Sequence, residues 1–230
     1  ADFVSSHLQI HKEKGASIYA SKLLKADYPL ITFDDGDVLE FGEIKLKALN
    51  TPGHSPDGIS VVLAHEGKDK AVFTGDTLFI GDCGRPDLRE TGDDLALKRE
   101  ELAKQMYSSL RNKLMKLDDS VLVYPAHGAG TLCGKALSAA NSSTIGAEKL
   151  SNWSLQDMTA SEFVSALTAD QPFIPMYFPY DVELNKKGAP DFKASLQQVV
   201  VGQKIDSLEK AQRLDPQFVI IDTRMSEIFK

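Results

Sequence analysis

Cysteine, positive charge and long apolar runs are all scarce in this sequence. Its 230 residues include two cysteines, which are too few for a disulfide framework and favour a reducing compartment, the cytoplasm. No apolar run reaches the roughly 18 residues that a membrane-spanning helix needs, so no membrane partner is expected. The net charge of −7 disfavours nucleic acid as the main partner, because phosphate binding needs a basic surface.

The residues that are present predict a layered α/β protein. Apolar residues make up 42% of the chain and charged residues 26%, as in globular proteins that fold around a core. Leucines at helical spacing predict one long helix over about 94–116, and Asp35-Gly36 predicts the turn of a hairpin over 31–41. Strands are predicted in four further segments: 43–49, 59–64, 70–76 and 120–128.

Three of these strands end in a side chain suited to metal binding. His54 ends TPGH, Asp76 ends TGD and His127 ends YPAH, each beside a Gly or Pro that lets the backbone turn. Strand ends gather along one edge of a sheet, and imidazole with carboxylate suits a divalent metal of intermediate softness. Taken singly, a histidine is usually not a ligand and Asp76 can cap its turn, but the three together favour a metal site. The other histidines are interpreted as non-ligands: His7, His11 and His65.

The chain resembles the metallo-β-lactamase superfamily in three segments that contain these residues: TPGHSPDGISVVL, VFTGDTLFIGDCGRPDL and VYPAHGAGTLCGK. The match covers roughly residues 1–150 and implies an αββα sandwich. In the first motif of the superfamily, His-x-His-x-Asp-His, Asp2 would be the aspartate and Phe3 stands at the last histidine. The two leading histidines would then precede Ala1, which implies a truncated chain that lacks the first strands of the sandwich.

Phe3 bears on how many metal ions the resemblance implies. Binuclear zinc hydrolases of this fold, such as glyoxalase II, use the histidine at this position for their second metal, and a phenyl ring cannot replace it. An upstream histidine, His54 and Asp76 would leave a mononuclear triad, the arrangement of non-haem iron oxygenases. This resembles the persulfide dioxygenase branch, with Fe(II) as the implied cofactor and Zn as the alternative. Asp2 and His127 would then orient ligands or move a proton beside the metal.

The resemblance also implies a residue that binds the substrate. Arg85, in GDCGRPDL, would hold the anionic end of the substrate, because a guanidinium fork suits a carboxylate or phosphate. An ion pair with Asp82 or Asp87 is the structural alternative. Ala129 stands where relatives that use glutathione often carry an aromatic residue, which leaves another carrier, such as coenzyme A persulfide, open.

The two cysteines, Cys83 and Cys133, are interpreted first as small buried apolar side chains. Cys133, in GTLCGK, has a second interpretation, because the nearby Lys135 favours the thiolate form. If Cys133 faces the pocket, it is a sulfur-handling thiol.

The C-terminal segment SLEKAQRLDPQFVIIDTR resembles the first helix, strand and Asp-x-Arg of a rhodanese domain. The predicted organisation is a metallo-β-lactamase-like domain over residues 1–170, a Pro- and aromatic-rich connector over 171–200, and the start of a rhodanese-like α/β domain over 201–230. The cysteine that carries sulfur in rhodaneses lies further downstream, so truncation at both ends is expected.

The leading hypothesis is a mononuclear Fe(II) persulfide dioxygenase of sulfide detoxification. Its partners would be O2 and a low-molecular-weight thiol persulfide, which it would convert to sulfite, or to thiosulfate with a rhodanese; assembly into a homo-oligomer is left open. One alternative is a binuclear zinc thioester hydrolase of the glyoxalase II type. The other is a fragment that is not catalytic, because only two of its metal ligands would lie within the chain.

Overall fold

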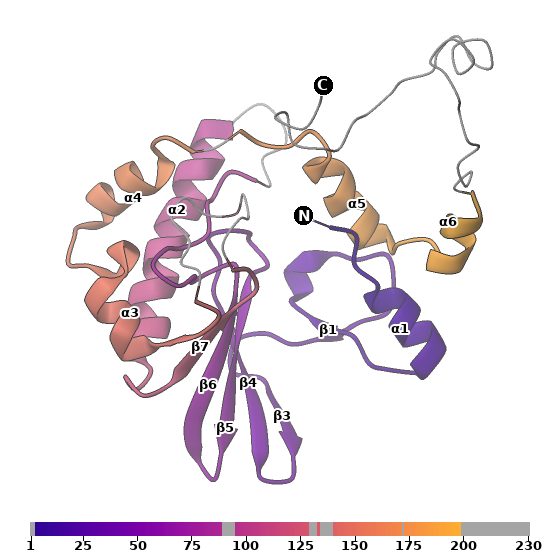
Figure 1. Cartoon of the computed structure of the whole chain (residues 1–230), viewed down its shortest axis with the longest axis horizontal. Coiled ribbons are helices and arrows are strands. Elements are labelled where there is room, and N and C mark those ends of the chain that lie inside the picture. Colours follow the sequence, from indigo (N-terminus) through magenta and orange to yellow (C-terminus); the bar gives the residue numbers. More distant parts are fainter. Residues whose placement is uncertain (1–2, 89–94, 129–132, 134–139, 172, 199–230) are drawn as a thin grey trace, which may run out of the picture. The chain divides into compact units, whose positions relative to one another are not determined.

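The structure is a computed structural model that describes residues 3–88, 95–128, 133, 140–171 and 173–198 (Figure 1). The chain divides into two compact units, Ala1–Ala189 and Pro190–Lys230. In the second unit the structure describes helix α6 (Phe192–Gln198). The predicted rhodanese-like segment, residues 201–230, lies outside the described residues.

Six strands of the first unit form the main sheet, in the order β3-β4-β5-β6-β7-β8. Their bounds are Val38–Phe41, Ile44–Asn50, Ile59–His65, Lys68–Gly75, Leu122–Pro125 and Ser143–Thr144. Neighbours are antiparallel except β6 and β7, which run parallel and are joined through α2, as a parallel pair requires. Two short strands, β1 (Tyr19–Ala20) and β2 (Ile31–Thr32), form a separate parallel pair.

Most helices of the first unit follow the strands β3 to β6 in the chain, and α1 precedes them. The α-helices described are α1 (His7–Lys14), α2 (Leu95–Asn112), α3 (Ile145–Ser151), α4 (Ala160–Thr168) and α5 (Phe178–Lys187). Short 3-10 helices are η1 (Lys22–Leu24), η2 (Leu114–Lys116) and η3 (Trp153–Leu155). Within the described ranges, no helix has both the length and the apolar character needed to cross a membrane.

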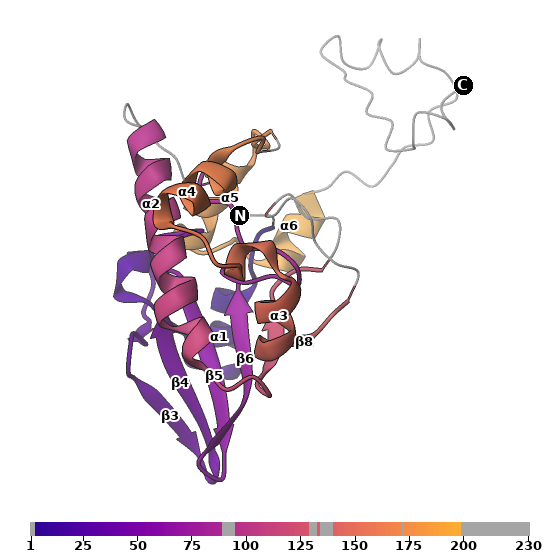
Figure 2. The same cartoon turned by 90° about the vertical axis from the view of Figure 1, so that its left-hand side faces the viewer.

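Helices α2 and α3 cover one face of the main sheet (Figures 1 and 2). Helix α4 packs on α2, where the rings of Tyr107 and Phe163 lie 5.4 Å apart between centroids. The core between sheet and helices contains side chains that are buried from water: Val62, Val72, Val123, Met106, Leu110 and Ile145. Burial of this apolar surface, at about 25 cal/mol per Å², is the main force that holds the helices on the sheet.

The opposite face of the sheet is also apolar, and it is exposed in the part of the chain that the structure describes. The rings of Phe73 and Tyr124 stack on this face at 5.7 Å between centroids, and both are more than a third exposed. Val61 pairs with Phe73 in the strand register and therefore lies on the same face. The mixed α/β fold predicted for the first domain is confirmed, with six strands in one sheet and two in the other.

The direction of the strands brings the predicted site residues to one edge. Strands β4 and β6 are each antiparallel to β5 and therefore run the same way, and β7 is parallel to β6. The carboxyl ends of these three strands meet at one edge, where His54, Asp76 and His127 follow them. The gathering of strand ends that the sequence pattern predicts is therefore correct.

Two details of the predicted organisation differ. The predicted hairpin over 31–41 is wrong, because β2 pairs with β1 and β3 pairs with β4 through the turn at Gly42. Asp35-Gly36 does form a turn, but the Gly36 N–H donates to the Ala48 carbonyl in β4 and not to β2, so the turn does not join β2 to β3 as a hairpin. Within the predicted connector, residues 178–187 form α5, which belongs to the first compact unit.

Gly53 allows the loop that carries His54 to lie against α2. It has a φ of +151°, and a Cβ at this position would lie 2.6 Å from both Cα and Cβ of Met106. Ser109, one turn further along α2, donates from its hydroxyl to the Pro52 carbonyl at 2.7 Å. The helix therefore fixes the position of the loop immediately before His54.

We expect Gly53→Ala to lower the free energy of unfolding, because the added methyl group clashes with the backbone of α2. Gly67→Ala is the matched control, since Gly67 also has a positive φ but no atom within 4 Å of an added Cβ. Urea unfolding should show a loss about 1–3 kcal/mol larger for Gly53→Ala than for Gly67→Ala. Equal losses would mean that backbone strain alone explains the need for glycine.

Candidate metal site

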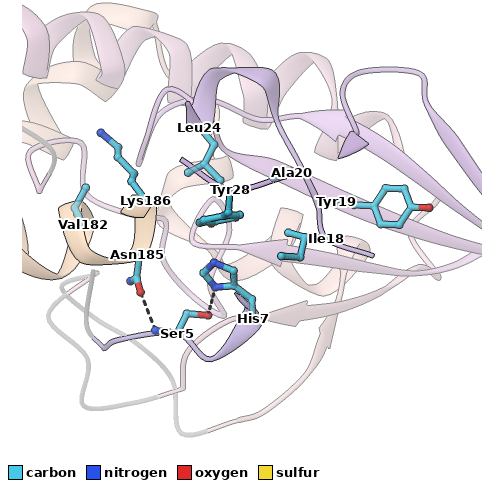
Figure 3. A pocket seen from close by; sticks show the side chains of 10 residues that line it. All are labelled: Ser5, His7, Ile18, Tyr19, Ala20, Leu24, Tyr28, Val182, Asn185 and Lys186. Atoms are coloured by element: carbon cyan, nitrogen blue, oxygen red, sulfur yellow. Dashed lines mark hydrogen bonds between the residues drawn. The ribbon is translucent and has the colours of Figure 1, made fainter. Parts of the chain in front are cut away.

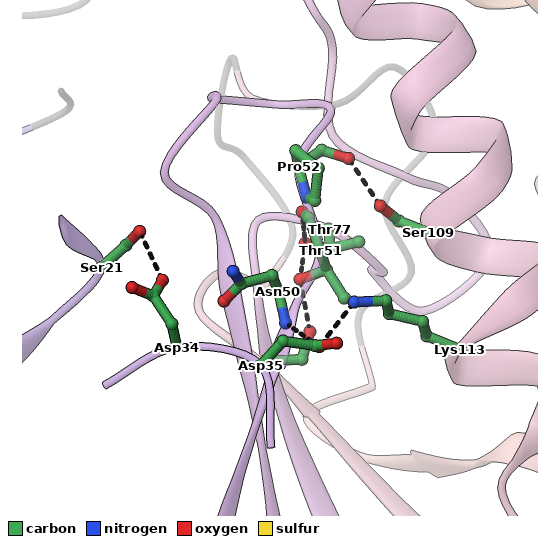
Figure 4. A network of polar contacts seen from close by, with 10 residues as sticks. Ser21, Asp34, Asp35, Asn50, Thr51, Pro52, Thr77, Ser109 and Lys113 are labelled. Carbon is green, nitrogen blue, oxygen red and sulfur yellow. Dashed lines mark hydrogen bonds and ion pairs between the residues drawn. The ribbon is translucent and has the colours of Figure 1, made fainter. Parts of the chain in front are cut away.

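Buried hydroxyl groups tie together the loops that carry His54 and Asp76 (Figure 4). The hydroxyl of Thr77 lies 3.1 Å from the Thr51 carbonyl and 3.0 Å from the Thr51 hydroxyl. The Thr51 hydroxyl in turn lies 2.9 Å from that of Ser60. All three threonine and serine side chains are buried, so these hydrogen bonds replace those with water and hold the ends of β4, β5 and β6 together.

The loop after Asp76 returns very close to its own start. A Cβ at Gly84 would lie 1.9 Å from the Asp76 carbonyl oxygen and 3.1 Å from Cβ of His54. Gly84 N–H donates to the Thr77 carbonyl at 3.3 Å, and Leu78 and Cys83 form an isolated antiparallel bridge. Glycine at position 84 is therefore what allows the loop to pass beside both candidate ligands.

His54 and Asp76 face one another at the centre of the site. Nδ1 of His54 lies 2.8 Å from the carbonyl oxygen of Arg85, and a carbonyl only accepts, so Nδ1 carries a proton. Nε2 of His54 points to the Asp76 carboxylate, with 3.2 Å between Nε2 and Oδ2. In the neutral imidazole these two atoms present lone pairs to each other, an arrangement that a proton or a metal ion between them stabilises.

His127 approaches the other oxygen of Asp76. Its Nε2 lies 3.3 Å from Oδ1, an ion-pair distance, and Oδ1 is otherwise buried without a hydrogen-bond donor among the described residues. Burial alone would raise the pKa of Asp76, but His127 and His54 more than offset it and hold this pKa well below its usual range. The Asp76 carboxylate, followed by the Cys133 thiol, raises the pKa of His127 to about 10.

Cys133 lies beside these groups and is 2% exposed. Its sulfur, a ligand nitrogen of His54 and a carboxylate oxygen of Asp76 are all within 4.8 Å of one another. On its other side it packs in an apolar cluster with Phe79, Leu88 and Phe178. Cys133 therefore faces the site, which meets the condition attached to its predicted sulfur-handling role, although that role itself stays a prediction.

Cys83 follows its first interpretation. It is 1% exposed and belongs to the apolar core beneath α2 and α3.

Arg85 is not placed as the resemblance implies. Its side chain is 1% exposed, and Nε and Nη2 each lie 2.7 Å from an oxygen of the Asp87 carboxylate. The ion pair weighed as the structural alternative is thus formed, and the contact with a substrate stays a prediction that requires the guanidinium to move. The backbone of Arg85 has a clear role, because its carbonyl accepts from His54 and its N–H donates to the Cys133 carbonyl at 3.0 Å.

Sequence reasoning missed the group that supports the loop after Asp76. The buried side-chain amide of Asn152 donates to the carbonyls of Phe79 and Asp82, both at 3.0 Å, and to Glu148 at 2.8 Å. Trp153 donates from Nε1 to the Asp82 carboxylate at 2.7 Å. These residues lie some 70 positions from the loop, and a single sequence carries no signal of such a contact.

The first motif is described only in part. Asp2, predicted to act beside the metal, lies outside the described residues, as does Ala129. Phe3 is 66% exposed, and its carbonyl accepts from the Asn185 side chain at 3.0 Å. The inference of one metal ion from Phe3 therefore stays a prediction.

A separate pocket of about 310 Å³ lies between the N-terminal segment and α5 (Figure 3). The rings of His7 and Tyr28 meet in it at 4.9 Å between centroids, and burial lowers the pKa of His7. None of the residues that line this pocket belongs to the group around Asp76. The pocket shows that α5 packs beside the segment that contains Ser5 and His7.

The chemistry of these residues fits a divalent metal ion. A fixed imidazole tautomer, a buried carboxylate oxygen without a hydrogen bond and a neighbouring thiol are all donors that first-row transition metals prefer. His54 through Nε2 and Asp76 through its carboxylate would hold the ion. The predicted ligands His54 and Asp76 are thus brought together, with His127 and Cys133 beside them.

The pKa shifts predict how pH affects the metal-free protein. The pKa of His127 is raised from 6.5 to about 10, so its stabilising contribution is complete below pH 6.5 and is lost as pH rises toward 10. Asp76 has a lowered pKa, so its contribution is present above about pH 4 and is lost as pH falls below that value. With a chelator present, urea unfolding should show the free energy falling between pH 6.5 and 10.

His127→Gln should remove most of this decline, whereas His11→Gln, on the exposed helix α1, should keep it. Parallel pH profiles for wild type and His127→Gln would contradict the expectation.

The chain is similar to several curated proteins over part of its length. Over 94 residues the chain is 35% identical to the mitochondrial persulfide dioxygenase ETHE1 of Homo sapiens, covering 41% of this chain and 32% of that protein. It is 37% identical over 97 residues to a hydroxyacylglutathione hydrolase of Dictyostelium discoideum, covering 41% and 32%. The chain spans between 32% and 47% of the length of the first curated relatives it matches.

The fold is shared with solved structures. A crystal structure of a metallo-beta-lactamase from Staphylococcus aureus is 36% identical and superposes with a TM-score of 0.76, covering 82% of this chain and 57% of that one. The family model of the metallo-beta-lactamase superfamily matches residues 4–127, which is more than half of the chain and extends to His127. The chain belongs to the metallo-beta-lactamase superfamily, whose members bind metal ions and are usually enzymes.

Proposed function

We propose that the protein is a persulfide dioxygenase that uses one Fe(II) ion held by His54 and Asp76. The observation that carries this proposal is the 3.2 Å approach of His54 Nε2 to Asp76, with the tautomer of His54 set by the Arg85 carbonyl. Imidazole and carboxylate from two strand ends are two members of the triad that non-haem iron oxygenases use. The similarity to a human persulfide dioxygenase over 94 residues supports the same activity.

The proposed reaction converts a thiol persulfide, O2 and water into the parent thiol, sulfite and two protons. The sulfur–sulfur bond breaks, the outer sulfur is oxidised and O2 is reduced. Bound iron supplies the redox chemistry that lets O2 react with sulfur. The third protein ligand of the triad is expected from the histidines that the first superfamily motif places before Asp2.

Other residues would control the surroundings of the reacting sulfur. Phe79, Leu88 and Phe178 form an apolar cluster beside Cys133 and would limit the access of water. His127, 3.3 Å from Asp76, would orient that carboxylate or move a proton beside the metal, and Asp2 would assist it. Arg85 would bind the anionic end of the carrier thiol.

A binuclear zinc hydrolase is the second candidate function. The similarity to a hydroxyacylglutathione hydrolase favours it, and the same three residues, His54, Asp76 and His127, would contribute ligands. Phe3 disfavours it, because the usual second-metal histidine is absent from that position. A role without catalysis is the third possibility and would leave the site without a metal requirement.

The proposal extends to a fused rhodanese-like domain and to the location of the protein in the cell. A fused rhodanese-like domain would transfer the outer sulfur of a second persulfide to sulfite, which gives thiosulfate and the parent thiol. A cytoplasmic location would suit two reduced cysteines. Neither affects the ligands argued above.

The proposal predicts that the full-length protein, loaded anaerobically with Fe(II), consumes O2. With glutathione persulfide or coenzyme A persulfide as substrate, an oxygen electrode should record turnover with one iron per chain, and sulfite should form in step with O2 loss. Loss of a residue that only supports a metal ligand lowers activity roughly 10–100-fold. His54→Ala removes a ligand itself and should therefore lower the rate by at least this factor.

His11→Ala is the matched control, because His11 lies in α1 and its Nδ1 contacts the nearby Ala16 carbonyl at 2.7 Å, away from the group around Asp76. It should retain the wild-type rate. Two zinc ions per chain together with thioester hydrolysis would favour the second candidate, and no O2 uptake with any persulfide would overturn the first.

A further inference from the structure

Three different donor types meet at the candidate site, and all three lie on residues that the structure describes. They are an imidazole nitrogen of His54, a carboxylate oxygen of Asp76 and the sulfur of Cys133, mutually within 4.8 Å. We propose that Cys133 binds the metal ion directly, as a further ligand beside His54 and Asp76. This inference rests on the metal site in the proposed function and adds a ligand that the superfamily motifs do not supply.

The distances are near those of a bound metal. Zn–N and Zn–O bonds of about 2.0–2.2 Å and Zn–S bonds of about 2.3 Å put tetrahedral ligand atoms roughly 3.4–3.6 Å apart. Nε2 of His54 and Oδ2 of Asp76 already lie 3.2 Å apart. The sulfur lies within 4.8 Å of a ring nitrogen of His54 and of a carboxylate oxygen of Asp76. A movement on the order of 1 Å, which rotation of one side chain can supply, would bring it to a bonding distance.

The backbone holds His54 and Cys133 in a fixed relation. Arg85 accepts a hydrogen bond from Nδ1 of His54 at 2.8 Å and donates its own N–H to the Cys133 carbonyl at 3.0 Å. One peptide segment thereby sets the orientation of the imidazole and the position of the cysteine. The Arg85 side chain is itself anchored by the buried pair with Asp87, so this segment has little freedom to shift.

The surroundings of the thiol favour a ligand role. Cys133 is buried against Phe79, Leu88 and Phe178, and its polar contacts lie on the side of His127 and Asp76. The carboxylate oxygen Oδ1 of Asp76 is buried, and apart from the 3.3 Å contact with Nε2 of His127 it has no hydrogen-bond donor among the described residues, as expected for an atom placed to bind a cation. A metal ion would bind thiolate, imidazole and carboxylate together, and the histidine expected to complete the triad would add a fourth protein ligand.

The donor set also indicates which metals would bind. Thiolate and imidazole favour Zn²⁺ and Co²⁺ over Mg²⁺ or Ca²⁺, and Fe²⁺ remains compatible. A thiolate that is bound to a metal is not available to accept sulfur, so the ligand role and the predicted sulfur-handling role of Cys133 exclude each other while the ion is bound.

The test adds Co²⁺ to metal-free protein under reducing, anaerobic conditions and records the absorption spectrum. A cysteine ligand should produce a near-ultraviolet sulfur-to-cobalt charge-transfer band that saturates at one ion per chain. Cys133→Ala should lose this band and bind Co²⁺ at least about tenfold more weakly. Cys83→Ala, which removes the other buried thiol, should keep both the band and the affinity.

The possible results separate this inference from the proposed function. Binding of Co²⁺ without the band, and with equal affinity in Cys133→Ala, would overturn the cysteine ligand and leave the metal site standing. Failure of wild type to bind Co²⁺ would overturn the metal site itself. An exposed group, Glu43, His65 and Glu66, also has metal-binding side chains, but it holds no sulfur and cannot produce the band.

X-ray absorption on the zinc-loaded wild type is a second measurement that needs no variant, in case Cys133→Ala does not fold. A sulfur neighbour at about 2.3 Å would support the inference, and a shell of nitrogen and oxygen alone would overturn it.

Discussion

The hydrogen bond from Nδ1 of His54 to the Arg85 carbonyl is the interaction on which the site depends. It fixes the imidazole tautomer, and it leaves Nε2 facing Asp76 at 3.2 Å, where two lone pairs meet unless a cation lies between them. The same residue holds Cys133 through its N–H. The donors are therefore prearranged by the backbone, and a metal ion would not have to order them.

The fold maintains this arrangement from two directions. The parallel course of β4, β6 and β7 delivers the ligand-bearing loops to one edge, and α2 presses on the first loop at Gly53. From the other side, the amide of Asn152 holds the carbonyls of Phe79 and Asp82. A loop with so many buried polar groups is stable only because almost every one of them has a partner.

Much of the site can be predicted from the sequence, because its signals are local. The alternation of apolar residues gives the strands, and His54, Asp76 and His127 follow them directly, so their meeting at one edge is predictable. Helix α5 also has local signals in the sequence, because Pro179 lies near its start, Lys186 and Lys187 lie in its last turn and Gly188 follows it. The aromatic and proline residues around it instead favour the interpretation of this segment as a connector. The pairing of β2 with β1 and the support that Asn152 gives to the loop after Asp76 depend on contacts between distant parts of the chain, which no local pattern encodes.

The close passage at Gly84 limits how this site can evolve. Any side chain there would collide with the backbone of Asp76, so the path of the loop cannot change by gradual substitution at that position. The apolar neighbours Phe79, Leu88 and Phe178 carry no such constraint from the backbone. Adaptation to new substrates would therefore proceed by substitution of these three apolar side chains, while the turn at Gly84 stays the same. The residues that set substrate preference are thus different from those that hold the metal ligands.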